Sequence, residues 1–122
     1  MSVIPTEDSE QAALFDWAAC SAGKHPELDL MHAIPNGGKR HIVTAMTMQR
    51  TGAKSGVPDI FLPIARGGKH GLYIELKRIK GGTVSANQKT WLAALSDQGY
   101  ECAICRGWEE ARKEILKYIK EG

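Results

Sequence analysis

The chain has no apolar run long enough to cross a membrane and no signal-peptide pattern at its N-terminus. These two absences predict a cytosolic protein without a membrane partner. Internal repeats, low-complexity segments and the GxxxxGK[ST] spacing of a phosphate-binding P-loop are also missing. With 122 residues, 43% of them hydrophobic and 25% charged, we expect one domain over residues 1–122 with a core of its own.

Cysteine is scarce, with three residues in the chain, which excludes a disulfide framework. Cys102 and Cys105 form a single Cys-x-x-Cys that has no second pair and no nearby histidine. A zinc or redox role is therefore disfavoured, and we expect these two side chains to be buried in a strand.

Acidic residues are nearly absent from the middle of the chain. Residues 30–81 hold nine basic residues and only two acidic ones, Asp59 and Glu75, although the net charge of the whole chain is only +2. A basic field around two isolated carboxylates suits a polyanionic substrate that approaches a bound cation. A solvated basic face without a partner is the alternative that charge alone leaves open.

Hydrophobic periodicity and turn residues predict the element order α, β, α, β, β, α, β, α. The expected helices are residues 8–22, with Asp8 as the cap, 41–50, 86–97 and 108–120. The expected strands are residues 30–34, two runs within 56–77 on either side of a Gly-rich break at 66–71, and residues 100–105, with a loop at 23–29. This order predicts an α/β fold with a central mixed sheet and helices on both faces.

The two strands within residues 56–77 each carry charge that a buried strand should not have. Asp59 opens the first strand, and Glu75 and Lys77 lie near the end of the second. Because residues i and i+2 of a strand point to the same face, Glu75 and Lys77 share a face with Tyr73. The hairpin-like break brings Asp59 alongside them. Two carboxylates and one ammonium on one side of an apolar sheet suit a site for a divalent metal.

Such a set of residues fits the hydrolysis of a phosphodiester. Mg²⁺ held by one or two carboxylates, a carbonyl and water supplies a nucleophilic water and stabilises charge on the phosphate. Asp59 and Glu75 can supply the carboxylates, the backbone carbonyl of Leu76 a third ligand, and Lys77 a cation for the attacking water or the developing charge. Glu10 could bind a second metal or orient water. The alternative is two surface strands with a Glu–Lys pair, since short matches of this kind occur by chance.

Two further polar residues lie on apolar helix stripes. Glu10 precedes Leu14 and Ala18 by helical spacing, and it either favours the first helical turn as acids do or points toward the site. Gln88 has the Ser-x-x-Gln spacing of a capping box with Ser85, and it is either a structural cap or a polar group aimed at the site.

Basic residues follow or occupy the Gly-rich loops. Lys39 and Arg40 follow the turn Pro35–Gly38, and Lys54 lies in the loop between Gly52 and Gly56. The first of these loops either holds phosphates or is an ordinary exposed turn.

Together these motifs resemble the VRR-NUC nucleases, a branch of the PD-(D/E)xK superfamily with a restriction-endonuclease-like core, and in particular the small stand-alone members from phages and bacteria. The resemblance covers nearly the whole chain: Glu10, Ile34 to Arg40, Gly52 to Asp59, Gly71 to Lys77, Ser85 to Gln88, and Gly99-Tyr100. The ordered combination is much more specific than any one motif.

The resemblance implies a role for each matching residue. Asp59, Glu75 and the Leu76 carbonyl would bind Mg²⁺, for which Mn²⁺ would substitute, and Lys77 would be the catalytic lysine. Glu10 would complete the acidic site, and Gln88 would enter it from the third helix. All five side chains would then be catalytic residues, with Lys39, Arg40 and Lys54 as the expected DNA contacts.

The resemblance also implies a homodimeric nuclease selective for branched DNA, such as a four-way (Holliday) junction, with a part in DNA repair, recombination or replication. Symmetric cutting of two strands needs two sites related by a twofold axis, and one small domain has one site. A nuclease of the same fold that acts on flaps, nicks or plain duplex, and a non-catalytic nucleic-acid-binding module, are the alternatives.

Overall fold

The computed structural model describes residues 3–35 and 42–120. The elements are α1 (Glu7–Ser21), the 3₁₀ helix η1 (Pro26–Leu30), β1 (His32–Ala33), α2 (Ile42–Arg50), β2 (Ile60–Leu62), β3 (Leu72–Lys77), α3 (Ala86–Asp97), β4 (Glu101–Arg106) and α4 (Trp108–Lys120). The predicted order of helices and strands is confirmed, with η1 as an addition. It begins in the expected loop at 23–29 and ends at Leu30, so the strand expected at 30–34 is shorter than predicted. Pro26 begins η1, where its fixed φ suits a first helical turn and its missing N–H costs nothing.

The four strands form one sheet in the order β1-β2-β3-β4. β2 runs antiparallel to both β1 and β3, whereas β4 runs parallel to β3. A parallel pair needs a crossover connection, and α3 provides it between β3 and β4. The sheet is therefore mixed, as predicted.

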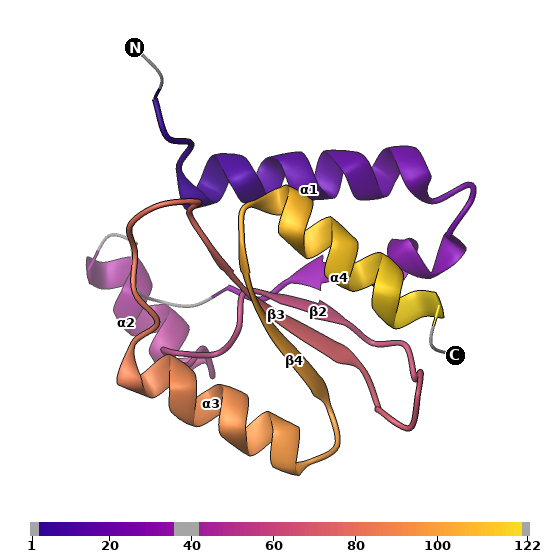
Figure 1. The fold of residues 1–122 in the computed structure, drawn as a ribbon. Coiled ribbons are helices and arrows are strands. Elements are labelled where there is room, and N and C mark those ends of the chain that lie inside the picture. Colours follow the sequence, from indigo (N-terminus) through magenta and orange to yellow (C-terminus); the bar gives the residue numbers. More distant parts are fainter. Residues whose placement is uncertain (1–2, 36–41, 121–122) are drawn as a thin grey trace.

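Helices cover both faces of this sheet. α1 and α4 lie side by side across one face, and α3 lies across the other face against β4 (Figure 1). The predicted α/β arrangement with helices on both sides is therefore confirmed.

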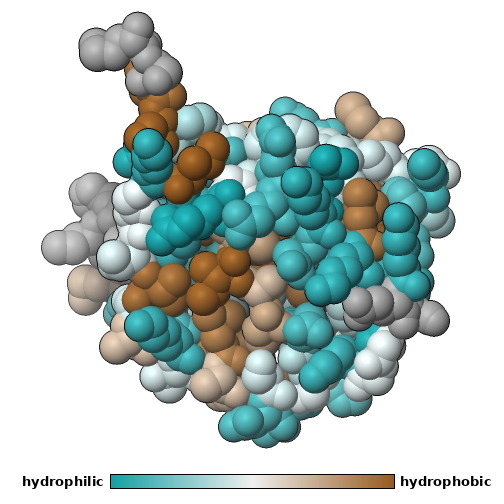
Figure 2. All heavy atoms as spheres, in the orientation of Figure 1, coloured by the Kyte–Doolittle hydropathy of each residue, from teal (hydrophilic) through white to brown (hydrophobic). Residues whose placement is uncertain are grey.

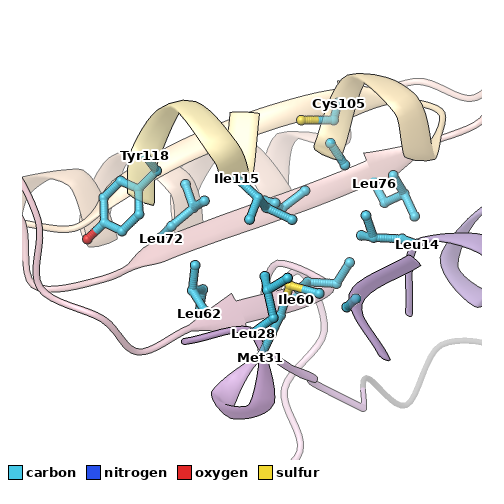
Figure 3. Close-up of a cluster of buried hydrophobic side chains, with 13 residues drawn as sticks. Leu14, Leu28, Met31, Ile60, Leu62, Leu72, Leu76, Cys105, Ile115 and Tyr118 are labelled. Atoms are coloured by element: carbon cyan, nitrogen blue, oxygen red, sulfur yellow. The ribbon is translucent and has the colours of Figure 1, made fainter. Parts of the chain in front are cut away.

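The core lies between the sheet and the α1–α4 layer (Figure 3). Alternate residues of β3 enter it, namely Leu72, Ile74 and Leu76, each at most 1% exposed. Leu14 from α1 and Ile115 from α4 pack on them from the helix layer. Successive side chains of a strand point to opposite faces, so the intervening residues of β3 lie on the other face of the sheet, where the predicted site residues are found.

The N-terminus of α1 differs from the prediction. Thr6, and not Asp8, is the N-cap, and its hydroxyl accepts a hydrogen bond from the N–H of Ser9. Thr6 has an extended backbone and lies three residues before Ser9, which places its oxygen at an unpaired first-turn donor. Asp8 lies inside the first turn, where its charge complements the helix dipole.

The surface is mixed in character. No helix in residues 3–35 and 42–120 is long and apolar enough to cross a membrane. Figure 2 shows a mainly hydrophilic face with hydrophobic areas in separate places on it. Ile79 and Ile104 are among the large apolar side chains left exposed, at 53% and 45%.

Candidate active site

The candidate site lies where β2 begins and β3 ends. Asp59 immediately precedes β2, and the register that pairs Ile60 with Ile74 continues to place Asp59 opposite Glu75. Both residues therefore belong to the sheet face away from the α1–α4 core. Two separate chain segments thus bring two carboxylates together, as the sequence predicts.

Glu75 is almost completely buried, at 1% exposure. Its Oε2 atom lies 3.5 Å from Lys77 Nζ and accepts a hydrogen bond of 3.1 Å from Gln88 Nε2. Its Oε1 atom is buried and has no hydrogen-bond partner in the described residues. A buried carboxylate oxygen without a partner is costly, so this atom fits a site that receives a cation or a proton.

Asp59 is fixed by the backbone of the neighbouring strand. Its Oδ2 atom accepts a hydrogen bond of 2.8 Å from the N–H of Leu76. The side chain is only half-buried, so it can still meet solvent or a ligand. This bond holds the carboxylate of Asp59 next to the peptide unit that joins Glu75 to Leu76.

The environment of Glu75 favours its protonated form. Burial raises the pKa of Glu75 to about 8, and the negative charge of Asp59 contributes in the same direction. The ammonium of Lys77 opposes this effect by stabilising the carboxylate. A buried carboxyl group with a strongly raised pKa, beside a second carboxyl group and a lysine, is typical of functional sites.

Gln88 reaches the site from the first turn of α3 and performs both roles left open by the sequence. Its side-chain oxygen accepts a hydrogen bond of 2.8 Å from Ser85 N, and Ser85 Oγ accepts one of 3.1 Å from Gln88 N, which completes the capping box. Its side-chain nitrogen donates to Glu75. The cap fixes the orientation of the amide so that its N–H points at the carboxylate.

Glu10 is placed differently from the other four site residues. It is 4% exposed, and its Oε1 atom accepts a hydrogen bond of 3.2 Å from the N–H of Trp108, the first residue of α4. Its Oε2 atom is buried without a hydrogen-bond partner in the described residues. The carboxylate thus faces a helix N-terminus, which favours negative charge. Its membership of the metal site stays a prediction, and the contacts in the structure are with α4.

The residues present fit Mg²⁺ better than a metal bound by several strong ligands. Among the described residues there is no cluster of three or more His, Cys, Asp or Glu side chains that could hold a metal. Mg²⁺ is commonly bound by one or two carboxylates and completes its shell with water and phosphate. Asp59 and Glu75, with the partnerless Glu75 Oε1 atom, meet that requirement.

The predicted DNA contacts are only partly placed. Lys39 and Arg40 lie outside the described residues. Lys54 is exposed and lines a pocket of about 620 Å³, to whose wall α2 contributes Met48 and α3 contributes Trp91. Its role as a DNA contact stays a prediction.

Both cysteines of the Cys-x-x-Cys lie in β4, as predicted, but only Cys105 is buried as expected, whereas Cys102 is half-buried. All three cysteines of the chain are free, and Cys105 is fully buried in the core. Burial raises the pKa of the Cys105 thiol to about 12, which disfavours the reactive thiolate. Cys102 and Cys105 are three residues apart in β4 and so point to opposite faces, which prevents them from acting as a pair.

The sequence did not reveal how the connection from Lys77 to Gln88 is held. The guanidinium of Arg106 donates to the carbonyls of Arg78, Gly81 and Gly82, at 3.0, 2.7 and 3.0 Å. Arg106 is opposite Lys77 in the parallel register of β3 and β4. An arginine at the end of a strand is the only local signal, and its partners become apparent only once the chain is folded.

Comparison with known proteins agrees with this arrangement. A family model described as "VRR-NUC domain" matches residues 4–109. A solved structure described as "VRR_NUC domain protein" is 31% identical to the chain, with a TM-score of 0.83, and the alignment covers 98% of this chain and 93% of the other. Comparison with curated proteins gives no significant match.

Proposed function

Because the chain belongs to the VRR-NUC family, we propose that it is a divalent-metal-dependent DNA endonuclease selective for branched DNA, with a four-way junction as the expected substrate. The observation that carries this proposal is the buried Glu75 Oε1 atom, which lacks a partner among the described residues and lies in a carboxylate pair with Asp59. A pair of this kind can bind a hard cation at neutral pH, provided that the cation displaces a proton.

Asp59, Glu75 and the Leu76 carbonyl would hold Mg²⁺, and Mn²⁺ would substitute for it. When bound, the ion supplies a water of lowered pKa and stabilises charge on the phosphate. The Asp59–Leu76 hydrogen bond orients one carboxylate, and the Gln88–Glu75 hydrogen bond orients the other. These two bonds prepare the ligands before substrate arrives, which reduces the reorganisation needed during the reaction.

Lys77 would act on the scissile phosphate or on the attacking water. The residue is 5% exposed, and its ammonium is held 3.5 Å from Glu75 Oε2. A buried cation in this position can donate a hydrogen bond to the water or to a phosphate oxygen as negative charge develops there. Its attachment to Glu75 keeps it beside the metal ligands.

We further propose that the protein acts as a homodimer. One chain supplies one carboxylate pair, and symmetric incision of a junction requires two sites related by a twofold axis. Exposed large apolar side chains such as Ile79 and Ile104 are consistent with a surface that contacts a partner. Sedimentation equilibrium should give the mass of two chains, and a monomer that cuts junctions symmetrically would contradict this part of the proposal.

The decisive experiment measures cleavage of a four-way junction with Mg²⁺ or Mn²⁺ by wild type, Asp59→Asn and Glu75→Gln. Both variants should lose roughly a hundredfold or more in rate while still binding the junction in Ca²⁺, because the substitutions remove metal ligands and keep side-chain size. Asp97→Asn, at the exposed end of α3, is the matched control and should cut at the wild-type rate. Wild-type rates in both site variants would refute the metal-site assignment.

The substrate is tested by comparing a junction, a 5′ flap, a nicked duplex and a linear duplex in the same assay. A strong preference for the junction supports branched-DNA selectivity, whereas equal rates on all four remove it. Salt-dependent binding without cleavage in any divalent metal would instead indicate a non-catalytic nucleic-acid-binding module.

A further inference from the structure

We propose that Pro58 is a positioning residue for the metal site: because it has no N–H, it leaves the Leu76 carbonyl without a backbone partner and so free to bind the metal. This inference rests on the proposed function. It assigns a role to a side chain that carries no polar group.

The hydrogen-bonding direction of each β3 residue follows from the sheet. The carbonyls of Gly71 and Lys77 accept from Glu101 and Gly107, so the odd-numbered carbonyls of this strand face β4. The even-numbered residues, Leu76 among them, consequently present their N–H and C=O groups to β2.

The same alternation holds on β2. The carbonyl of Asp59 accepts a hydrogen bond of 2.7 Å from Ile34 N, so the odd-numbered residues of this segment face β1. Even-numbered residues face β3, and Ile60 is paired with Ile74. The next hydrogen-bonded pair of the antiparallel ladder, two residues before Ile60 and two residues after Ile74, would be Pro58 and Leu76.

Pro58 and Leu76 do not exchange the two backbone hydrogen bonds of an ordinary antiparallel pair. The N–H of Leu76 is taken by Asp59 Oδ2 at 2.8 Å, and Pro58 has no N–H to donate to the Leu76 carbonyl. Outside the strand ladders, no backbone donor to this carbonyl is found in residues 3–35 and 42–120. The ladders supply none either, because β2 begins only at Ile60 and the Leu76 carbonyl faces away from β4. Any other residue at position 58 would present an N–H to the carbonyl, and the ladder could extend by one bond.

Pro58 is also fully buried, so its position is fixed by packing. The N–H of Leu76 is therefore bonded to one proposed metal ligand, Asp59. The carbonyl of the same residue is a second proposed metal ligand. A donor at position 58 would compete with the metal for that carbonyl. Groups that orient metal ligands typically change metal affinity by about 10- to 100-fold when they are altered.

The test compares two substitutions that differ in one group. Pro58→Ala introduces an N–H, whereas lactic acid at position 58, incorporated as the α-hydroxy acid, gives the same methyl side chain with an ester oxygen in place of the N–H. Mn²⁺ binding is measured by titration calorimetry, and unfolding temperature is measured without metal. Pro63→Ala, an exposed proline just past the other end of β2, is the control and should bind Mn²⁺ as wild type does.

We expect Pro58→Ala to bind Mn²⁺ about tenfold more weakly than wild type and the lactic acid variant to recover most of that loss. In the Pro58→Ala variant, the new backbone amide should also be protected from hydrogen exchange in the metal-free protein. Equal Mn²⁺ affinity in wild type and Pro58→Ala overturns the inference. So does an equal loss in both variants, because the pyrrolidine ring and not the missing N–H would then be responsible. Absence of saturable Mn²⁺ binding by wild type would instead overturn the proposed metal site.

Discussion

Glu75 combines burial, a negatively charged neighbour and one oxygen without a partner among the described residues. Its pKa is raised to about 8, so near neutral pH the metal-free protein holds a proton on this carboxyl group. Binding of the proposed Mg²⁺ would have to release that proton, because only the carboxylate form of Glu75 can be a ligand. The chemistry of the site is therefore linked to pH at a single side chain.

We predict that the apparent affinity for Mg²⁺ rises with pH up to about 8 and then levels off, because deprotonation of Glu75 no longer opposes binding above its pKa. Titration calorimetry near neutral pH in buffers of different ionisation enthalpy should report close to one proton released per ion bound. An affinity that stays constant from mildly acidic pH up to that pKa would contradict the assignment of Glu75 as a ligand.

A second prediction concerns stability without metal. The pKa of Glu75 is raised in the folded protein, so below its ordinary value of 4.5 the group is protonated in both states and contributes no pH dependence. Between pH 4.5 and about 8 the folded state holds a proton that the unfolded state has released, so the free energy of unfolding falls as pH rises.

Glu75→Gln should remove this dependence. Relative to wild type, its free energy of unfolding should increase between about pH 5 and about pH 8 by a few kcal/mol at most, since one pKa unit corresponds to about 1.4 kcal/mol. Urea denaturation of both proteins at the two pH values in EDTA measures the difference. Parallel pH profiles for the two proteins would show that Glu75 has an ordinary pKa.

At the scale of elements, the connection between β3 and α3 determines whether Gln88 reaches Glu75. Gly81 and Gly82 have positive φ values of 79° and 64°, a conformation that favours glycine, and Arg106 donates to both of their carbonyls. The arginine thereby ties the connection to the end of β4.

We predict that Arg106→Gln raises hydrogen exchange in residues 78–84 and lowers the cleavage rate about tenfold, because α3 no longer holds the Gln88 amide firmly on Glu75. Hydrogen exchange followed by mass spectrometry measures the first effect. Arg112→Gln on α4 should leave both exchange and rate unchanged. Unaltered exchange in Arg106→Gln would show that the turn at Gly81 and Gly82 is stable without the arginine.

At the scale of the whole molecule, the α1–α4 layer supports the sheet from the side opposite the site. Leu14 is fully buried, and Figure 3 places it against the β3 side chains that alternate with the site residues. Because interiors are close-packed, loss of this side chain should be felt across the core.

Leu14→Ala should lower the free energy of unfolding by about 2–5 kcal/mol, the usual cost of a large buried cavity. Asp16→Ala, on the exposed side of the same helix, should change it by about 0.5 kcal/mol or less. Denaturant unfolding of both variants checks the prediction, and an equally small effect for Leu14→Ala would mean that α1 does not contribute to the core as described.

Much of this architecture was predictable because its signals are local. The period of two along β3 separates Glu75 and Lys77 from the leucines and isoleucine, and the structure confirms that separation. The bounds predicted for α3 and α4 are those observed, since Ser85 caps one helix and Gly107 precedes the other. Local cues were insufficient at α1, where Thr6 and Asp8 both suit a cap and the backbone conformation decides between them.

The sequence by itself determined which residues share a strand face or a helix stripe, because those relations depend only on the period of the backbone. Only the tertiary structure decided which distant groups meet: Asp59 with the N–H of Leu76, Gln88 with Glu75, Arg106 with the glycine turn, and Glu10 with the N-terminus of α4. Each of these contacts joins separate elements, and its partner is set by strand register and helix packing. The sequence therefore identifies the residues of the candidate site, whereas the fold determines the hydrogen bonds that they make.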